Sequence, residues 1–351
     1  MPAVLSGLQK SLPELALDLV RANEKSDMEA VNEALHAVGR RTPEADPAEL
    51  TAAAAAIAPA LAEADFLDAA PIGYLAGHLV EMGADPAVVL EPLANQVAAG
   101  LMGAVVFPER WSALTGTEVP PGDAKERLPE VMDRISDSDD AVAAMCWFTI
   151  DEWMPAMLVT LQQREARRML PYREELLAAA TAAGGVVDGA HWLYGLLMVL
   201  DDEPAIVLHR ETGRGYRVTF GGIGDNFQLH TLLAATLIGD PDAGLLPGIP
   251  PRPQWVAAAT DGDLQPAVPV EGQFNLVDGY GKWIWNEGRP ADIPHMDGTR
   301  VIVLDPPPYP RRWNIGRVYP LMRPTLTVDG PLPADEAARW LARVAPEASP
   351  D

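Results

Sequence analysis

The chain is poor in cysteine and in lysine. Cys146 is its single cysteine among 351 residues, and only four of the 26 basic residues are lysine. One thiol excludes an intramolecular disulfide and a zinc site built from several cysteines. Cys146 lies in the apolar stretch AAMCWFTIDEWM, which is typical of a buried, inert thiol. The preference for arginine, with abundant alanine and proline, indicates a high-GC bacterial coding bias.

The sequence also lacks a long uninterrupted apolar run. Its most apolar stretch, TAAAAAIAPALA, is short and is broken by Pro59, so it does not predict a membrane span. Near the amino terminus, leucines recur at spacings of three and four with acidic residues between them. This spacing is typical of an amphipathic helix and not of a signal peptide. We expect a cytoplasmic protein with no membrane partner.

Positive charge is scarce overall, because 50 acidic residues give a formal net charge of −24. Affinity for nucleic acid comes largely from cationic side chains that neutralise phosphates. We therefore expect no nucleic-acid partner. The apolar fraction of 48% is typical of a globular protein with a sizeable core.

The two halves of the chain follow different patterns, which predicts an α+β fold. Apolar residues spaced by three and four dominate the first half, whereas short alternating segments and prolines dominate the second. We expect a helical N-terminal region followed by a smaller mixed or antiparallel β domain with long Pro-rich loops. The predicted boundaries are a helical domain over 1–203, an α+β domain over 204–345 and a frayed tail over 346–351.

In the second half, residues 205–220 predict a hairpin that turns at Gly213-Arg214-Gly215. Asp225 or Asn226 is expected to cap a helix that runs to residue 238. Further strands are predicted at 272–277, 282–286, 300–304 and 325–328, and residues 301–304 are apolar enough for a central strand. Residues 305–323 form a long loop rich in proline, arginine and aromatic residues, which is typical of a functional loop.

No high-specificity catalytic motif is present. The stretch GGIG lies between a predicted strand and a predicted helix, but it lacks the lysine and the spacing of a phosphate-binding loop. His209, His230 and His295 lie in the same half as several carboxylates, yet no ligand spacing supports a metal site. We therefore predict no metal, and the sequence leaves any cofactor unknown.

One segment of this acidic chain is locally basic and rich in aromatic residues. Between residues 280 and 323, seven bases outnumber four acids, with tryptophans and tyrosines interleaved. The planar guanidinium groups of arginine and a pocket lined by aromatic side chains suit a small anionic or peptide-like ligand. We expect catalytic roles for Glu287, His295 and His230, of which Glu287 or His295 is the acid/base. The predicted substrate-binding residues are Trp285, Asn286, Arg289, Arg312, Trp313 and Arg217.

Three functions are compatible with the sequence. The first is an enzyme with its site in a cleft between the helical and β regions, and its reaction type is left open. The second is a non-catalytic accessory protein that docks an acidic partner through residues 281–317. The third is a scaffold whose helical half is the interaction surface. The same arginines could instead join the two domains, and the oligomeric state is left open.

Overall fold

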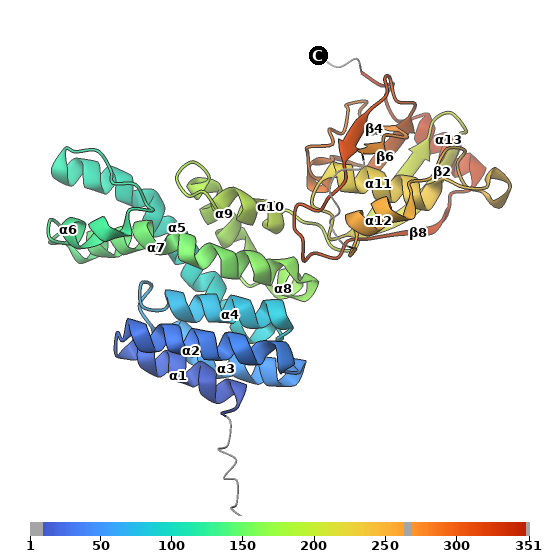
Figure 1. The fold of residues 1–351 in the computed structure, drawn as a ribbon. Coiled ribbons are helices and arrows are strands. Elements are labelled where there is room, and N and C mark those ends of the chain that lie inside the picture. Colours follow the sequence, from blue (N-terminus) through green and yellow to red (C-terminus); the bar gives the residue numbers. More distant parts are fainter. Residues whose placement is uncertain (1–9, 263–268, 349–351) are drawn as a thin grey trace, which may run out of the picture. The chain divides into compact units, whose positions relative to one another are not determined.

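The computed structural model describes residues 10–262 and 269–348. The chain divides into two compact units, Met1–Leu197 and Met198–Asp351. The first unit is helical and the second combines a mixed sheet with helices (Figure 1). The predicted α+β class is therefore confirmed.

The first unit consists of helices whose apolar faces pack on one another. Their ends carry the expected signals: Asp27 and Asp46 accept hydrogen bonds from the first turns of α2 and α3, and Gly83 and Gly116 end α4 and α5 in the left-handed conformation. The helices are α1 (Leu12–Glu24), α2 (Met28–Arg41), α3 (Pro47–Glu63), α4 (Ala70–Met82), α5 (Ala87–Thr115), α6 (Leu128–Met132), α7 (Ser138–Gln162), α8 (Arg164–Met169), α9 (Arg173–Ala183) and α10 (Ala190–Leu197).

Glycines allow α4 to approach α7 closely. A Cβ added at Gly77 would lie 2.6 Å from the Cα of Ala156, and one at Gly73 would lie 2.9 Å from the ring of Trp153. Trp153 is completely buried, stacks on Phe66 and donates its indole N–H to the Phe66 carbonyl. The glycines of α4 therefore set the distance between two core helices.

Two helices of this unit, α5 and α7, are long and apolar enough to cross a membrane by length and composition alone. Core helices of soluble proteins pass the same test. The most apolar 18-residue stretch of each helix is partly buried inside the unit, 44% of it in α5 and 56% in α7. Much of the apolar surface of both helices therefore packs against other helices.

The second unit is built on a mixed sheet with the strand order β4-β6-β1-β2-β8, in which β5 pairs with β6. β1 and β6 are parallel, and the other pairs are antiparallel. Residues 301–304 lie in β6 and are fully buried, which confirms the predicted central strand. The strands are β1 (Glu203–His209), β2 (Arg214–Gly221), β3 (Pro269–Glu271), β4 (Asn275–Asp278), β5 (His295–Met296), β6 (Thr299–Asp305), β7 (Arg312–Asn314) and β8 (Thr325–Pro331).

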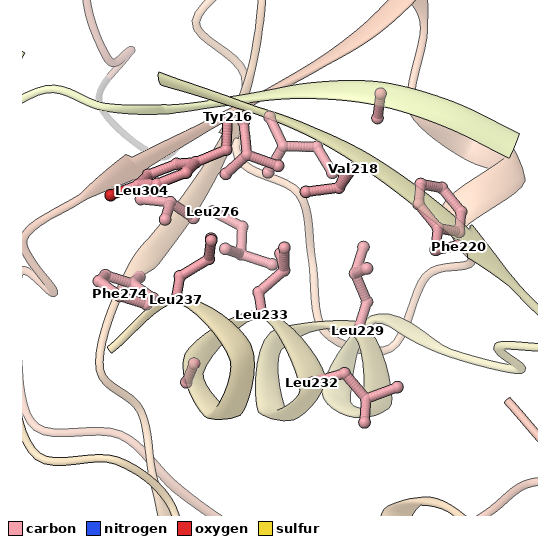
Figure 2. Close-up of a cluster of buried hydrophobic side chains, with 14 of the residues drawn as sticks. Tyr216, Val218, Phe220, Leu229, Leu232, Leu233, Leu237, Phe274, Leu276 and Leu304 are labelled. Carbon is pink, nitrogen blue, oxygen red and sulfur yellow. The ribbon is translucent and has the colours of Figure 1, made fainter. Parts of the chain in front are cut away.

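The main core of this unit lies between the sheet and helix α11 (Asn226–Leu237). In Figure 2, Leu229, Leu233 and Leu237 point from α11 toward β2, where Val218 and Phe220 face them. Two shorter helices complete the unit, α12 (Pro253–Ala259) and α13 (Ala334–Leu341). Asp225 caps α11 as predicted, because its carboxylate accepts a hydrogen bond from the Gln228 N–H at 2.8 Å.

The strand predicted at 282–286 is wrong. The chain makes only an isolated bridge there, between Trp283 and Val277, and it turns away at Asn286. The chain leaves the sheet here because the carbonyls of Asn286 and Gly288 accept hydrogen bonds from the first turn of α11 and not from a neighbouring strand. The predicted strand 272–277 is shorter and begins at Asn275, while β3 and β7 form a separate two-stranded sheet.

Part of the tail predicted to fray is hydrogen bonded. Asn275 donates its amide to the Glu347 carboxylate at 2.6 Å, and the Ala348 N–H donates to the Gly281 carbonyl at 2.8 Å. Residues 349–351 lie outside the described residues.

Candidate functional site

The segment that the sequence singled out lies on the amino-terminal end of α11. The backbone N–H groups of Asn226 and Phe227 donate to the carbonyls of Gly288 and Asn286, at 2.9 and 3.1 Å. The Asn226 side-chain amide donates to the Trp285 carbonyl at 2.8 Å. These bonds satisfy helix-end donors that would otherwise lack partners, and they hold Trp285–Gly288 beside the cap of α11.

Asp225 is the most strongly perturbed carboxyl of this region. Burial raises its pKa to about 6, hydrogen bonds from the Gln228 and Phe227 backbone lower the pKa, and the negative charge of Glu287 raises it. Glu287 itself is exposed on the turn. A partly buried carboxyl that titrates near neutrality beside an exposed carboxylate is an arrangement suited to proton transfer.

Tyr319 lies close enough to Asp225 for their charges to interact. Its ring lies against the backbone of Gly224, where an added Cβ would meet it at 3.2 Å. Burial raises the pKa of Tyr319 to about 12, the positive charge of Arg289 lowers it, and the negative charge of Asp225 raises it. The phenol therefore stays protonated and can offer only hydrogen bonding. We name Asp225, Glu287, Arg289 and Tyr319 the α11-cap cluster.

Trp285 forms an exposed wall next to this cluster. Its side chain is 54% exposed, and its ring centroid lies 5.5 Å from that of Trp283. Trp283 also contacts Tyr309, with 6.5 Å between ring centroids, and the Arg311 guanidinium lies over both rings, 5.4 and 5.7 Å from their centroids. Aromatic and arginine side chains thus make one continuous surface.

His230 has a buried position and is neutral. Only 1% of the residue is exposed, and burial lowers its pKa to about 4. The Phe274 N–H donates to Nε2 at 3.2 Å, and the Trp313 ring meets the imidazole edge-on at 4.9 Å. Nδ1 makes no hydrogen bond within the described part of the chain. This environment gives His230 no solvent contact through which to exchange a proton with a substrate.

His295 lies at a different place on the unit, at the beginning of the parallel strand pair. It is exposed, and its Nε2 lies 3.2 Å from the Glu203 carboxylate. Arg300 donates to the same carboxylate oxygen at 2.8 Å. Within residues 10–262 and 269–348, no hydrogen bond or ion pair joins His295, Glu287 and His230 to one another.

The predicted ligand arginines are engaged with acidic side chains of their own unit. Arg312 pairs with Glu271 at 2.7 Å, and Arg289 pairs with Asp292 at 3.3 Å. Arg217 reaches Glu336 on α13 at 2.6 Å. The guanidinium groups are thus already balanced by carboxylates, which weakens the argument for an anionic ligand.

The structure brings together Trp285, Asn286, Glu287 and Arg289 at the cap of α11, and Trp313 lies against His230 and Phe227 deeper in the unit. Sequence reasoning missed Asp225 and Tyr319 as site residues. The available signal was Asp225 at the start of a helix after GGIG, which was interpreted only as a cap.

In the described residues, no group of three or more histidine, cysteine or carboxylate side chains could hold a metal ion. Comparison with known protein families, with curated protein sequences and with solved structures finds no significant match.

Proposed function

We propose that the second unit is an enzyme that performs acid–base chemistry on a small peptide-like substrate at the amino-terminal end of α11. Asp225 is the general acid or base, because burial raises its pKa toward neutrality and the negative charge of Glu287 adds to this shift. Trp285 supplies an exposed wall on which the substrate lies. The observation that carries the proposal is the hydrogen-bonded attachment of Trp285–Gly288 to the first turn of α11, which sets Glu287 beside Asp225.

Charge favours a peptide-like substrate over an anionic one. Two carboxyls and the acidic chain as a whole repel an anion, and the nearby Arg289 is already paired with Asp292. A neutral amide offers both a donor and an acceptor. The carboxylates of the α11-cap cluster can accept from its N–H, and Asp225 in its protonated form can donate to its carbonyl.

A second candidate function is the docking of an acidic partner protein. It rests on the surface formed by Trp283, Trp285, Tyr309 and Arg311, since tryptophan, tyrosine and arginine dominate the binding energy of protein interfaces. Trp285 belongs to both hypotheses, whereas only the enzymatic one requires a proton on Asp225.

The test measures turnover of chromogenic anilide and ester substrates of short peptides between pH 4 and pH 9. We expect wild-type rates to change through an apparent pKa near 6, and we expect Asp225→Asn to lose nearly all activity. Asparagine caps helices as well as aspartate does, so the variant keeps the local structure. Asp335→Asn, on the exposed start of α13, is the matched control and should leave the rates unchanged.

Two outcomes separate the candidates. Equal rates for the wild type and Asp225→Asn would refute the enzymatic proposal. Loss of partner capture in Trp285→Ala, with full capture in Asp225→Asn and no turnover by the wild type, would support docking instead.

A further inference from the structure

The helical unit contains an open cavity that the proposed function does not use. It has a volume of about 610 Å³ and lies between α2, α4 and α7. Ligand cavities of proteins are typically about 300–1,000 Å³ in volume and mostly apolar. The walls here include Val31, Leu35 and Leu75, and the rim carries Met28 and Tyr74, which are 59% and 57% exposed.

Small side chains keep this cavity open. Gly39 lies on its α2 wall, where an added Cβ would meet nothing within 4 Å. Pro155 lies on the α7 wall and has no N–H, so the helix lacks one of its backbone hydrogen bonds there. Gly39 thus leaves open space on this wall, which a side chain at the same position would enter.

The polar groups of the wall carry no unbalanced charge. Glu152 is ion-paired with Lys125. The Thr42 hydroxyl donates to the Gly39 carbonyl at 3.4 Å, so at 3.1 Å it accepts from Nε2–H of His78. A neutral imidazole that donates through Nε2 can accept a hydrogen bond at Nδ1.

We infer that this cavity is a binding site for a neutral, largely apolar small molecule that carries one hydrogen-bond donor. The apolar walls bind its body, and the imidazoles of His78 and His36, which also line the cavity, accept from its polar group. An anion is disfavoured by the net charge of −24.

The experiment titrates the full-length protein with Nile red, a neutral apolar dye, and follows dye fluorescence. We expect saturable binding to the wild type. Gly39→Phe, whose Cβ would meet no atom within 4 Å, adds a ring on the cavity wall and should weaken binding at least tenfold. Ala52→Phe on the exposed face of α3 is the control and should bind as the wild type does.

Methionine oxidation by peroxide locates the bound dye without any variant. Met28 on the rim should become protected, whereas Met102 on α5, which is 48% exposed and outside the cavity, should oxidise at an unchanged rate. Absence of saturable binding, equal affinity of a folded Gly39→Phe, or equal protection of the two methionines would overturn the inference. If Gly39→Phe does not fold, the oxidation of the two methionines in the wild type decides.

Discussion

Replacing Asp225 by asparagine should make the second unit more stable at neutral pH. The aspartate carboxyl is desolvated at the cap of α11, and burial raises its pKa from 3.8 to about 6. Asparagine keeps the cap through its side-chain oxygen and has no charge to desolvate. The substitution therefore removes the electrostatic cost and leaves the Gln228 N–H with an acceptor.

The sign and size of the effect follow from linkage. The folded state holds the proton of Asp225 more tightly than the unfolded state does, so the stability that this proton provides is complete below pH 3.8. It is lost as the pH rises through about 6. One pKa unit corresponds to about 1.4 kcal/mol, so the wild type loses about 3 kcal/mol relative to Asp225→Asn between pH 3 and pH 8.

Hydrogen exchange of the α11 amides measures this difference in the full chain, because it reports the opening of the second unit alone. Comparing the two proteins at the same pH cancels the intrinsic exchange rate. We expect protection in Asp225→Asn to exceed that in the wild type by an amount that grows with pH. A difference that stays constant with pH would refute the reasoning.

Two further predictions concern buried groups. His230 has a folded-state pKa of about 4, below the ordinary 6.5, so its contribution is complete above pH 6.5 and is lost as the pH falls through 4. His230→Gln should therefore lessen acid destabilisation by about 3 kcal/mol, measured by the same exchange assay; unchanged acid sensitivity would contradict this. Gly77→Val should destabilise the first unit by about 1–3 kcal/mol in thermal unfolding, because its side chain collides with Ala156. Gly39→Val, whose Cβ meets no atom within 4 Å, is the control, and equal melting temperatures for the two variants would argue against the close approach of α4 and α7.

Much of the fold could be predicted from local patterns. The helices of the first unit carry periodic apolar residues and identifiable caps. The β1–β2 hairpin joins a short apolar run to an alternating strand through Gly213, whose φ is 70°. The strand predicted at 282–286 is wrong because the alternation of side chains around Trp283 and Trp285 does not show whether a neighbouring strand is available for pairing. The carbonyls of this segment bond to a helix end, which only the tertiary structure provides.

The candidate site could be predicted only in part. Composition pointed to the segment that contains Trp285 and Glu287, but the pKa of Asp225 depends on burial that no local pattern reveals. The pairing of arginines with acids was equally hidden, because Arg217 meets Glu336 across 119 positions of sequence. Residue types therefore identified a region, whereas their roles depend on contacts between distant segments.

The proposed acid–base site is tested most directly by a carbon-13 NMR titration of the Asp225 carboxyl in the wild type and in Glu287→Gln. We expect a pKa of about 6 in the wild type. We expect a lower pKa in the variant, because the neighbouring negative charge is gone. A wild-type pKa near 3.8 that Glu287→Gln does not change would contradict the proposed acid–base site.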